Sequence, residues 1–287
     1  MRVWVLNFDA EFELEAGVRT TPTQAMRART LDIARTFATA LDPEDIVLAP
    51  ELEARRLDGA RSEAHGVAWC PTPRALEILK RAHIPRPIAP PFDTLRQVHD
   101  REFAWKLADG ELPGVLRATT LAEVEAHVEA RGLTGQWLMK RAFGVAGRGQ
   151  RAIHFGKLTD SDRAWVLASL RRAPLYIEPR LSIVRELSMH GWARESVEIR
   201  SIREQRVGLH RAWIESRRAS NLDASIERTL IDTGERVGCA LIAANYRGPF
   251  GIDAYEWQTP SGVLALRTLS EINPRYCMGW DKDDRWE

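Results

Sequence analysis

The sequence is poor in cysteine and has no long apolar run. Its three cysteines, Cys70, Cys239 and Cys277, are too few and too scattered for a disulfide framework or a thiolate metal site. No run of 18 apolar residues occurs, and the first residues lack an apolar core followed by a small-residue cleavage site. These absences predict a cytoplasmic protein with reduced thiols, no membrane partner and no secretory signal.

An excess of charge of one sign is also missing. The chain has 41 Lys and Arg residues against 40 Asp and Glu residues, a formal net charge of +1. A protein that holds nucleic acid mainly through phosphates needs a basic surface, so no nucleic-acid partner is predicted. The seven histidines show no metal-ligand spacing, and no Ser-His-Asp arrangement stands out. At 287 residues the chain exceeds the usual size of a single core, so two or three packed units are expected.

The first third of the chain predicts a small α/β unit. Three short apolar runs are typical of buried strands: residues 2–6, 45–50 and 66–70. Thr21 and Thr72, each followed by proline, predict helix starts after the first and third of these strands. This order of elements indicates a mainly parallel sheet. Four prolines between 85 and 91 then interrupt regular structure and indicate a domain boundary near residue 92.

The rest of the chain mixes helices with strands. Thr120 and Glu123 form a capping-box pattern at a helix start. Short strand patterns dominate residues 183–215, and residues 224–245 are the longest helix candidate. Two strands joined across QTPSG end the pattern, which is typical of an antiparallel hairpin.

The stretch KRAFGVAGRGQ at 140–150 gathers glycine and basic residues. Gly144, Gly147 and Gly149 lie between two strand-like segments, whereas Walker and dinucleotide loops lead into a helix. The pattern predicts a flexible β-hairpin whose backbone N–H groups can fold over a polyphosphate, with Lys140 reaching the same anion. A mobile hairpin tip with a solvated basic end is the alternative that the residues alone leave open.

Acidic residues recur in two late segments, GIDAYEW and SEINPRY. Glu271 and Asn273 are two apart on a strand, so their side chains share a face roughly 6.5 Å apart. A loop over 260–264 would place Asp253 opposite Glu271, although other loop lengths also fit. Two carboxylates and an amide oxygen would then converge, and such a set suits magnesium. A half-solvated sheet face that happens to carry acids is the alternative.

Taken in order, these segments resemble the ATP-grasp superfamily, which includes D-alanine–D-alanine ligase, biotin carboxylase and carbamoyl-phosphate synthetase. The resemblance covers residues 93–287, and the α/β unit before it is similar to the family's N-terminal domain. It implies an α/β protein of the α+β ATP-grasp type, in which a small parallel domain at 1–92 precedes two α+β subdomains that clamp ATP. The lid subdomain with the glycine-rich flap would span 93–181, and the subdomain with the magnesium site 182–287.

The resemblance also implies a role for individual nucleotide-site residues. DREFAWKLA supplies Lys106, which with Lys140 and the three flap glycines would bind the phosphates. YIEPRL resembles the hinge, so Glu178 is expected near the adenine amino group and the backbone amide of Leu181 beside it. RELSMHGW resembles the segment after the hinge and makes Glu186 the candidate for the ribose hydroxyls.

The magnesium and reaction roles follow from the same resemblance. Asp253, Glu271 and Asn273 are the implied ligands of one or two Mg²⁺ ions, for which Mn²⁺ could substitute. EINPR is similar to the carbamoyl-phosphate synthetase and biotin carboxylase pattern, whose arginine, here Arg275, faces the reacting phosphate. An oxyanion formed during acyl transfer needs a fixed cation. Arg275 is the first candidate, and three arginines on the preceding strands are alternatives: Arg200, Arg203 and Arg211.

The implied activity is that of an ATP- and magnesium-dependent ligase. A substrate carboxylate would take the terminal phosphate of ATP as an acyl phosphate, and an amine or similar nucleophile would then displace that phosphate. The partners would be a small-molecule carboxylate and an amine or peptide, and a homodimer is possible. Two alternatives stay open: an ATP-grasp kinase that phosphorylates a hydroxyl, and a non-catalytic ATP-binding module.

Overall fold

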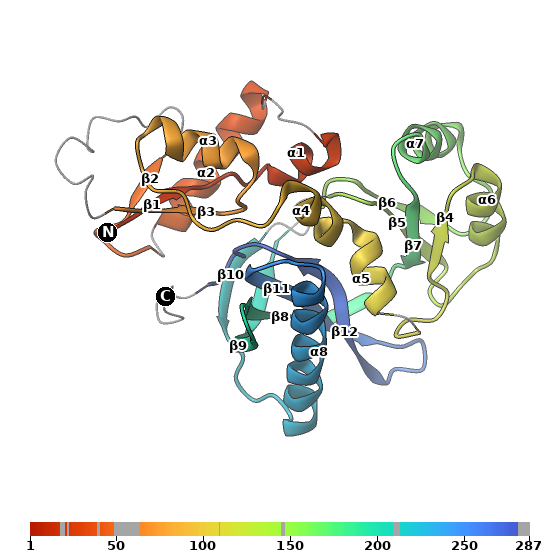
Figure 1. The fold of residues 1–287 in the computed structure, drawn as a ribbon. Helices are drawn as coiled ribbons and strands as arrows, with labels where there is room; N and C mark the ends of the chain where they lie inside the picture. The colour runs from red at the N-terminus through yellow and green to blue at the C-terminus, as the bar shows by residue number, and fades with distance from the viewer. Residues whose placement is uncertain are drawn as a thin grey trace.

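The computed structural model describes most of the chain: residues 1–17, 21, 23–38, 41–48, 64–108, 110–144, 147–208 and 213–280. Its strands form three separate sheets (Figure 1). We call them the N-terminal sheet (β1–β3), the lid sheet (β4–β7) and the C-terminal sheet (β8–β12). None of the helices in the described ranges is long and apolar enough to cross a membrane.

The N-terminal sheet confirms the expected parallel α/β unit. Its strands are β1 (Arg2–Val5), β2 (Ile46–Leu48) and β3 (His65–Ala68), paired in parallel in the order β2-β1-β3. The accompanying helices are α1 (Ala10–Ala16), α2 (Gln24–Ala38) and α3 (Pro73–Arg81). The helix start expected at Thr21 is wrong: α2 begins at Gln24, and the Thr23 hydroxyl accepts from the Met26 N–H at 3.3 Å. The short helix α1 was not expected from the sequence, and it carries Glu11 to the site described below.

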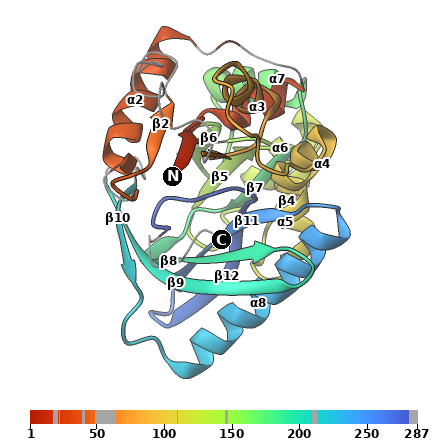
Figure 2. The ribbon, with the colours of Figure 1, turned by 60° about the vertical axis from the view of Figure 1, so that its left-hand side comes forward.

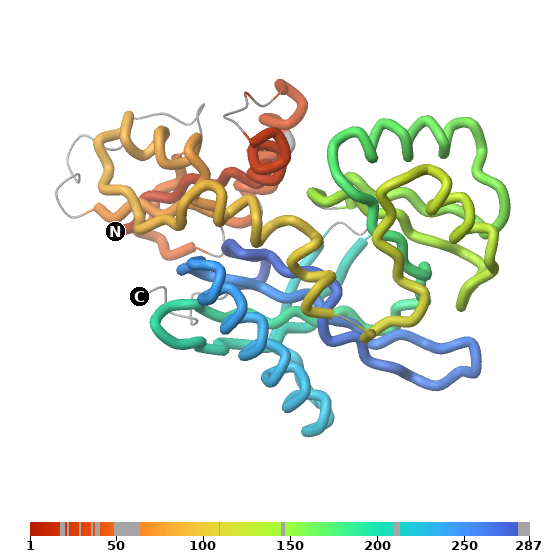
Figure 3. Tube along the Cα trace, turned by 45° about the vertical axis from the view of Figure 1, so that its right-hand side comes forward, coloured from red at the N-terminus to blue at the C-terminus, as the bar shows by residue number. Residues whose placement is uncertain are grey.

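Two short helices join the N-terminal sheet to the lid sheet. Helix α4 (Phe92–His99) begins directly after Pro91, and α5 (Arg101–Leu107) follows it after a single residue, Asp100. The Asp100 carboxylate accepts from the Glu102 N–H at 2.8 Å and so caps α5. Figure 3 shows the two helices crossing the C-terminal sheet, where both contact β12. This course places Arg101, the first residue of α5, within hydrogen-bond distance of Glu271 on β12.

The lid sheet is antiparallel and has its own core. Its strands lie in the order β4-β7-β5-β6: β4 (Leu116–Ala118), β5 (Gln136–Arg141), β6 (Gln150–His154) and β7 (Leu175–Pro179). Helices α6 (Leu121–Glu129) and α7 (Asp160–Leu170) pack on it, and Val124, Met139 and Ile177 are completely buried between the layers. The capping box of Thr120 and Glu123 is confirmed.

The C-terminal sheet has five antiparallel strands in the order β10-β9-β8-β11-β12. They are β8 (Ser182–Ala193), β9 (Val197–Val207), β10 (Trp213–Arg218), β11 (Gly248–Gln258) and β12 (Leu264–Asn273). Helix α8 (Ala224–Ala243) lies along one face and contacts β8, β9 and β12 (Figure 2). Gly238 permits this approach, because a Cβ there would lie 2.5 Å from Val197 Cγ1.

One hydrophobic core joins the N-terminal and C-terminal sheets. Trp4 from β1, Leu95 from α4 and Phe250 from β11 are completely buried in it. Trp280, near the end of the described chain, stacks on His190 with ring centroids 5.3 Å apart. The site residues of both sheets are therefore fixed relative to one another. The boundaries proposed at residues 92 and 181 stay predictions.

Candidate functional site

A cleft of about 780 Å³ lies where the three sheets meet. Most of the candidate residues line it: Lys140, Gly144, Gly147, Glu178, Leu181, Glu186, Asp253, Glu271, Asn273 and Arg275. Four described candidates are outside its lining, namely Lys106, Gly149, Arg200 and Arg203, and Arg211 lies outside the described residues. Residues far apart in the sequence thus converge on one cavity, which has the size of a small-molecule site.

The glycine-rich stretch forms the expected hairpin. Strands β5 and β6 pair antiparallel with Lys140 opposite Gln150, and the Arg141 N–H donates to the Gly149 carbonyl at 2.8 Å. Gly147 and Gly149 have φ values of 75° and 77°, a conformation that favours glycine. Gly149 therefore shapes the turn although it does not line the cleft.

Lys140 is buried at the base of this hairpin. Its Nζ atom forms an ion pair with Oε1 of Glu178 on the neighbouring strand β7. Burial opposes the ionisation of Glu178, but the charges of Lys140 and Arg267 outweigh it and lower the Glu178 pKa to about 2. Burial lowers the pKa of Lys140, and the nearby guanidinium groups of Arg101 and Arg267 add to this effect, which Glu178 opposes. Two cations, Lys140 and Arg267, thus share the single carboxylate of Glu178.

On the facing sheet, Asp253 pairs directly with Glu271 between β11 and β12, as expected. The expected loop, 260–264, was one residue out of place: β11 ends at Gln258 and β12 begins at Leu264, so the loop spans 259–263. A bulge next to Asp253 compensates for this shift and brings Asp253 opposite Glu271. In the bulge three residues of β12 (268–270) oppose one residue of β11, Ala254. The pairing is confirmed, but it depends on a bulge that the sequence did not suggest.

Glu111, in the loop after α5, holds this bulge. Its carboxylate accepts from the backbone N–H groups of Thr268 at 3.1 Å and Leu269 at 3.0 Å, and also from the Thr268 hydroxyl. Both N–H groups belong to buried residues that the β11 ladder leaves unpaired at this point. A residue outside the cleft thereby sets the position of the acidic pair.

We expect Glu111→Ala to cost about 1–3 kcal/mol of stability, because two buried N–H groups lose their acceptor. Affinity for magnesium–nucleotide should fall as well, because the register that brings Asp253 to Glu271 loosens. Urea unfolding and titration calorimetry with Mg-ADP measure the two effects. Glu123→Ala is the matched control, since Glu123 also accepts from two backbone N–H groups, at the exposed start of α6. Unchanged magnesium–nucleotide affinity in Glu111→Ala would contradict the assigned role of the bulge.

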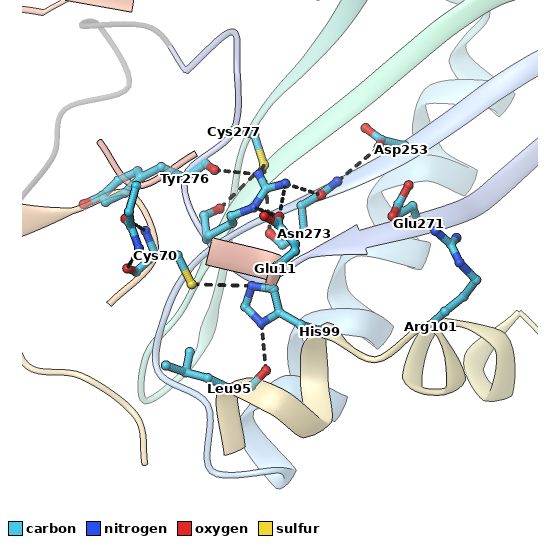
Figure 4. A network of polar contacts seen from close by, with 12 residues as sticks. Glu11, Cys70, Leu95, His99, Arg101, Asp253, Glu271, Asn273, Tyr276 and Cys277 are labelled. Carbon is cyan, nitrogen blue, oxygen red and sulfur yellow. Dashed lines mark hydrogen bonds and ion pairs between the residues drawn. The ribbon is translucent and has the colours of Figure 1, made fainter. Parts of the chain in front are cut away.

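The acidic pair is crowded and half-buried. Burial, followed by the charge of Glu271, raises the pKa of Asp253 to about 7. Asp253 Oδ2 accepts from Asn273 Nδ2 at 3.1 Å, and Glu271 Oε1 accepts from Arg101 Nη2 at 3.0 Å (Figure 4). Each of the two acids thus accepts a hydrogen bond from a protein donor in this arrangement.

These residues fit a hard divalent cation. Two carboxylates supply oxygen donors, and a cation between them would offset the charge of Glu271, which adds to burial in raising the pKa of Asp253. The amide of Asn273 turns its N–H group to Asp253 and its oxygen to Arg275, so it would have to turn over to bind the cation through oxygen. Within the described residues no group of three or more His, Cys, Asp or Glu side chains could hold a metal by itself. A Mg²⁺ ion would therefore need further ligands from phosphate or water, which is its usual habit.

Arg275 follows Asn273 and is held by the N-terminal sheet. Its Nε donates to Glu11 Oε1 at 2.8 Å, and its Nη2 donates to Asn273 Oδ1 at 3.0 Å. Burial acts against the charge, but Glu11 holds the pKa of Arg275 above its usual value. Because Arg275 can only donate, it fixes the amide of Asn273 with the oxygen toward the guanidinium. The arginine thus links α1 to the acidic pair.

The structure does not bring Lys106 to the cleft. Its side chain is 65% exposed and pairs with Glu102 at 2.9 Å. Arg101, at the start of the same helix, is buried instead and reaches both Glu271 and, at 3.2 Å, the Arg141 carbonyl at the base of the hairpin. Sequence reasoning missed Arg101, Arg267, Glu11 and Glu111. For Arg101, the available signal was its position as a charged residue directly after the helix cap Asp100.

Two of the alternative arginines are also away from the cleft lining. Arg200 pairs with Glu198 on the same strand at 2.7 Å. Arg203 is buried, and its Nε donates to Ser201 Oγ at 3.2 Å. Arg275 is therefore the candidate arginine that the described structure brings to the acidic pair.

The order of the three sheets, with a glycine-rich hairpin on one side of the cleft and an acidic pair on the other, defines an ATP-grasp fold. Solved ATP-grasp enzymes share it. N5-carboxyaminoimidazole synthetase from Staphylococcus aureus, complexed with ADP, matches with a TM-score of 0.51 and 11% identity over 96% of this chain and 70% of that one. D-alanyl-alanine synthetase A from Vibrio cholerae matches with a TM-score of 0.52 and 16% identity over 95% of this chain and 88% of that one.

Biotin carboxylase from Campylobacter jejuni, as a β,γ-ATP complex, is similar to the same extent. Its TM-score is 0.54 at 15% identity, over 96% of this chain and 65% of that one. No protein-family model matches the sequence, and no curated protein matches it. At these identities the similarity shows the fold alone, so the expected ATP-grasp fold is confirmed.

Proposed function

We propose that this protein is an ATP- and magnesium-dependent ligase that activates a carboxylate as an acyl phosphate and transfers the acyl group to an amine. One observation carries the proposal. In an ATP-grasp fold, a buried lysine under a glycine hairpin faces two paired carboxylates across a single cleft. Cations on one side and acids able to hold a cation on the other are what a triphosphate requires.

The nucleotide would lie between the lid sheet and the C-terminal sheet. Lys140 and the hairpin N–H groups would bind its phosphates, and Arg101 would take the part expected of Lys106, because it is buried beside Lys140 and Glu271. The backbone of Leu181 and the Glu186 carboxylate would contact adenine and ribose. Asp253, Glu271 and Asn273 would hold Mg²⁺, which when bound offsets the charge of the phosphates.

The acyl-transfer end of the cleft lies toward the N-terminal sheet. Arg275 is fixed there by Glu11 and would stabilise the oxyanion formed when the amine attacks. The surrounding described residues are mostly apolar or aromatic: Phe8, Ile33, Trp69, Ile214 and Met278. Such a lining favours a substrate with an apolar or aromatic group next to its reacting carboxylate. Closure of the hairpin would keep water from the acyl phosphate.

Trapping with hydroxylamine tests the proposal. The protein is incubated with ATP, Mg²⁺, hydroxylamine and a panel of aliphatic and aromatic carboxylic acids, and acyl hydroxamate and ADP are measured together. We expect both products in equal amounts with at least one acid, and neither when Mg²⁺ is removed. ADP release without hydroxamate, from a parallel panel of small alcohols, would indicate the kinase alternative. Magnesium-dependent ATP binding without turnover on the whole panel would indicate a binding module.

A further inference from the structure

Arg267, on β12, is a buried cation that none of the roles above uses. Its Nη1 donates to Glu178 Oε2 and to the Tyr255 hydroxyl, both at 2.8 Å, and its Nε donates to the Leu269 carbonyl at 3.2 Å. These bonds fix the guanidinium in the C-terminal sheet, next to the bulge. Arg267 therefore presents one face to the lid sheet in a defined orientation.

Glu178 connects Arg267 to Lys140. One carboxylate oxygen accepts from Arg267 and the other pairs with Lys140, so the three side chains form a line from β12 through β7 to β5. All three are at least 93% buried, with exposed fractions of 5% for Lys140, 7% for Glu178 and 6% for Arg267. This line spans the two sheets that enclose the proposed nucleotide site.

The charges in this line do not cancel. Two cations share one carboxylate, and the guanidinium of Arg101, which is itself paired with Glu271, also acts on Lys140. If Glu178 were free to turn both oxygens toward Lys140, the pair would be close to neutral and would attract phosphate weakly. Because Arg267 holds one of the two oxygens, Glu178 neutralises the charge of Lys140 only in part. The ammonium group can then use another of its three N–H donors to bind an anion.

We propose that Arg267 is a positioning residue for the nucleotide phosphates, which it serves by sharing Glu178 with Lys140. The inference rests on the proposed function, since it assumes that Lys140 binds a phosphate. It also assigns Glu178 a role beyond that of an adenine contact. By neutralising Lys140 in part, the carboxylate sets how strongly this lysine attracts an anion in the cleft. The same three groups join the lid sheet to the C-terminal sheet.

A double-mutant cycle read with two probes tests the inference. The dissociation constants of Mg-ADP and of adenosine are measured by calorimetry for the full chain and for Arg267→Met, Lys140→Met and the double variant. Arg267→Met should weaken ADP binding about tenfold and change adenosine binding less than about twofold. In the Lys140→Met background the Arg267→Met change should have almost no further effect on ADP, because the residue through which Arg267 acts is gone.

A residue that only stabilises the fold would behave differently. It would weaken ADP and adenosine alike and would act additively with Lys140→Met, and either result overturns the inference. Arg185→Met is the matched control, because Arg185 also bridges acids within the C-terminal sheet, Glu204 at 3.1 Å and Glu256 at 3.6 Å, away from the cleft lining. It should leave both dissociation constants unchanged.

Two further outcomes distinguish a failure of this inference from a failure of the proposed function. If Arg267→Met does not fold, Arg267→Lys replaces it, and its ADP affinity should lie between the affinities of the native protein and Lys140→Met while adenosine binding is retained. A native protein that binds neither ADP nor adenosine overturns the proposed function and the inference with it. If the native protein binds ADP, but no more tightly than Arg267→Met, the inference alone is overturned.

Discussion

Glu271→Gln is expected to reduce ATP turnover by a factor of at least about 100, because a neutral amide cannot replace a carboxylate that holds Mg²⁺ against the phosphates. The substitution keeps the shape of the side chain, so the pairing with Asp253 should persist. ADP release in the presence of an accepted carboxylic acid measures the effect. The fold itself should survive, because Glu271 is half-buried and its partner Arg101 keeps its bond to the Arg141 carbonyl.

Binding measurements give this prediction a second signature. In the native protein Arg101 is paired with Glu271 at 3.0 Å, so Glu271→Gln removes a negative charge beside the guanidinium and the proposed phosphate site, while the glutamine oxygen can still accept from Arg101. ADP affinity without Mg²⁺ should therefore stay constant or rise, while the gain in affinity that Mg²⁺ brings should disappear. A general disruption of the cleft would lower both affinities.

Glu256→Gln is the control for the same substitution on the same sheet. Glu256 lies on β11 three residues after Asp253, pairs with Arg185 at 3.6 Å, and does not line the cleft. Its replacement should leave turnover and the magnesium effect within about twofold of the native values, because Glu256 lies outside the cleft lining. Equal losses in Glu256→Gln and Glu271→Gln would refute a specific metal role for Glu271.

The local parts of this site were predictable from the sequence. A glycine-rich turn between two strand patterns and a Glu-x-Asn pair on one strand each depend on residues close in the chain. The hairpin at 140–150 and the shared face of Glu271 and Asn273 therefore follow from spacing alone. The parallel N-terminal sheet follows in the same way from the order of its elements.

Parts that depend on distant contacts were not predictable. The pairing of Asp253 with Glu271 needs the bulge held by Glu111, which lies 157 residues away from Thr268. Likewise, Lys106 and Arg101 are five positions apart on α5, which places them on different faces of the helix at about 100° per residue. Which face meets the cleft depends on how α5 packs against β12, and no periodic pattern in seven residues shows this.

Strand length and the two unexpected helices have the same explanation. The strand patterns at 183–215 suggested short strands, but β8 and β9 have 12 and 11 residues, because pairing of β8 with β9 and β11, and of β9 with β8 and β10, stabilises polar stretches that alternation alone would end. Helices α1 and α4 have seven and eight residues, too short to show a helical period. Their stability comes from packing on the core shared by the N-terminal and C-terminal sheets.

Glu11→Gln should destabilise the protein by about 3 kcal/mol, because it leaves the buried guanidinium of Arg275 without a counter-charge. Glu11 lies on α1 and Arg275 in the segment after β12, so their ion pair, 2.8 Å long, joins the N-terminal unit to the C-terminal sheet. The glutamine keeps one acceptor oxygen, which places the expected loss at the low end of the range for breaking a buried ion pair. The free energy of unfolding in urea measures it.

Glu15→Gln, one turn further along α1, is the matched control. Glu15 pairs with Arg172 at 3.2 Å, and the arginine side chain is 60% exposed, so the loss should stay below about 1 kcal/mol. Equal losses for the two variants would show that the buried pair does not hold the sheets together. The double variant Glu11→Gln with Arg275→Met removes the uncompensated charge and should regain much of the lost stability. It should not regain turnover, because Arg275 is the proposed oxyanion cation, and this difference separates the structural role of the pair from its role in the reaction.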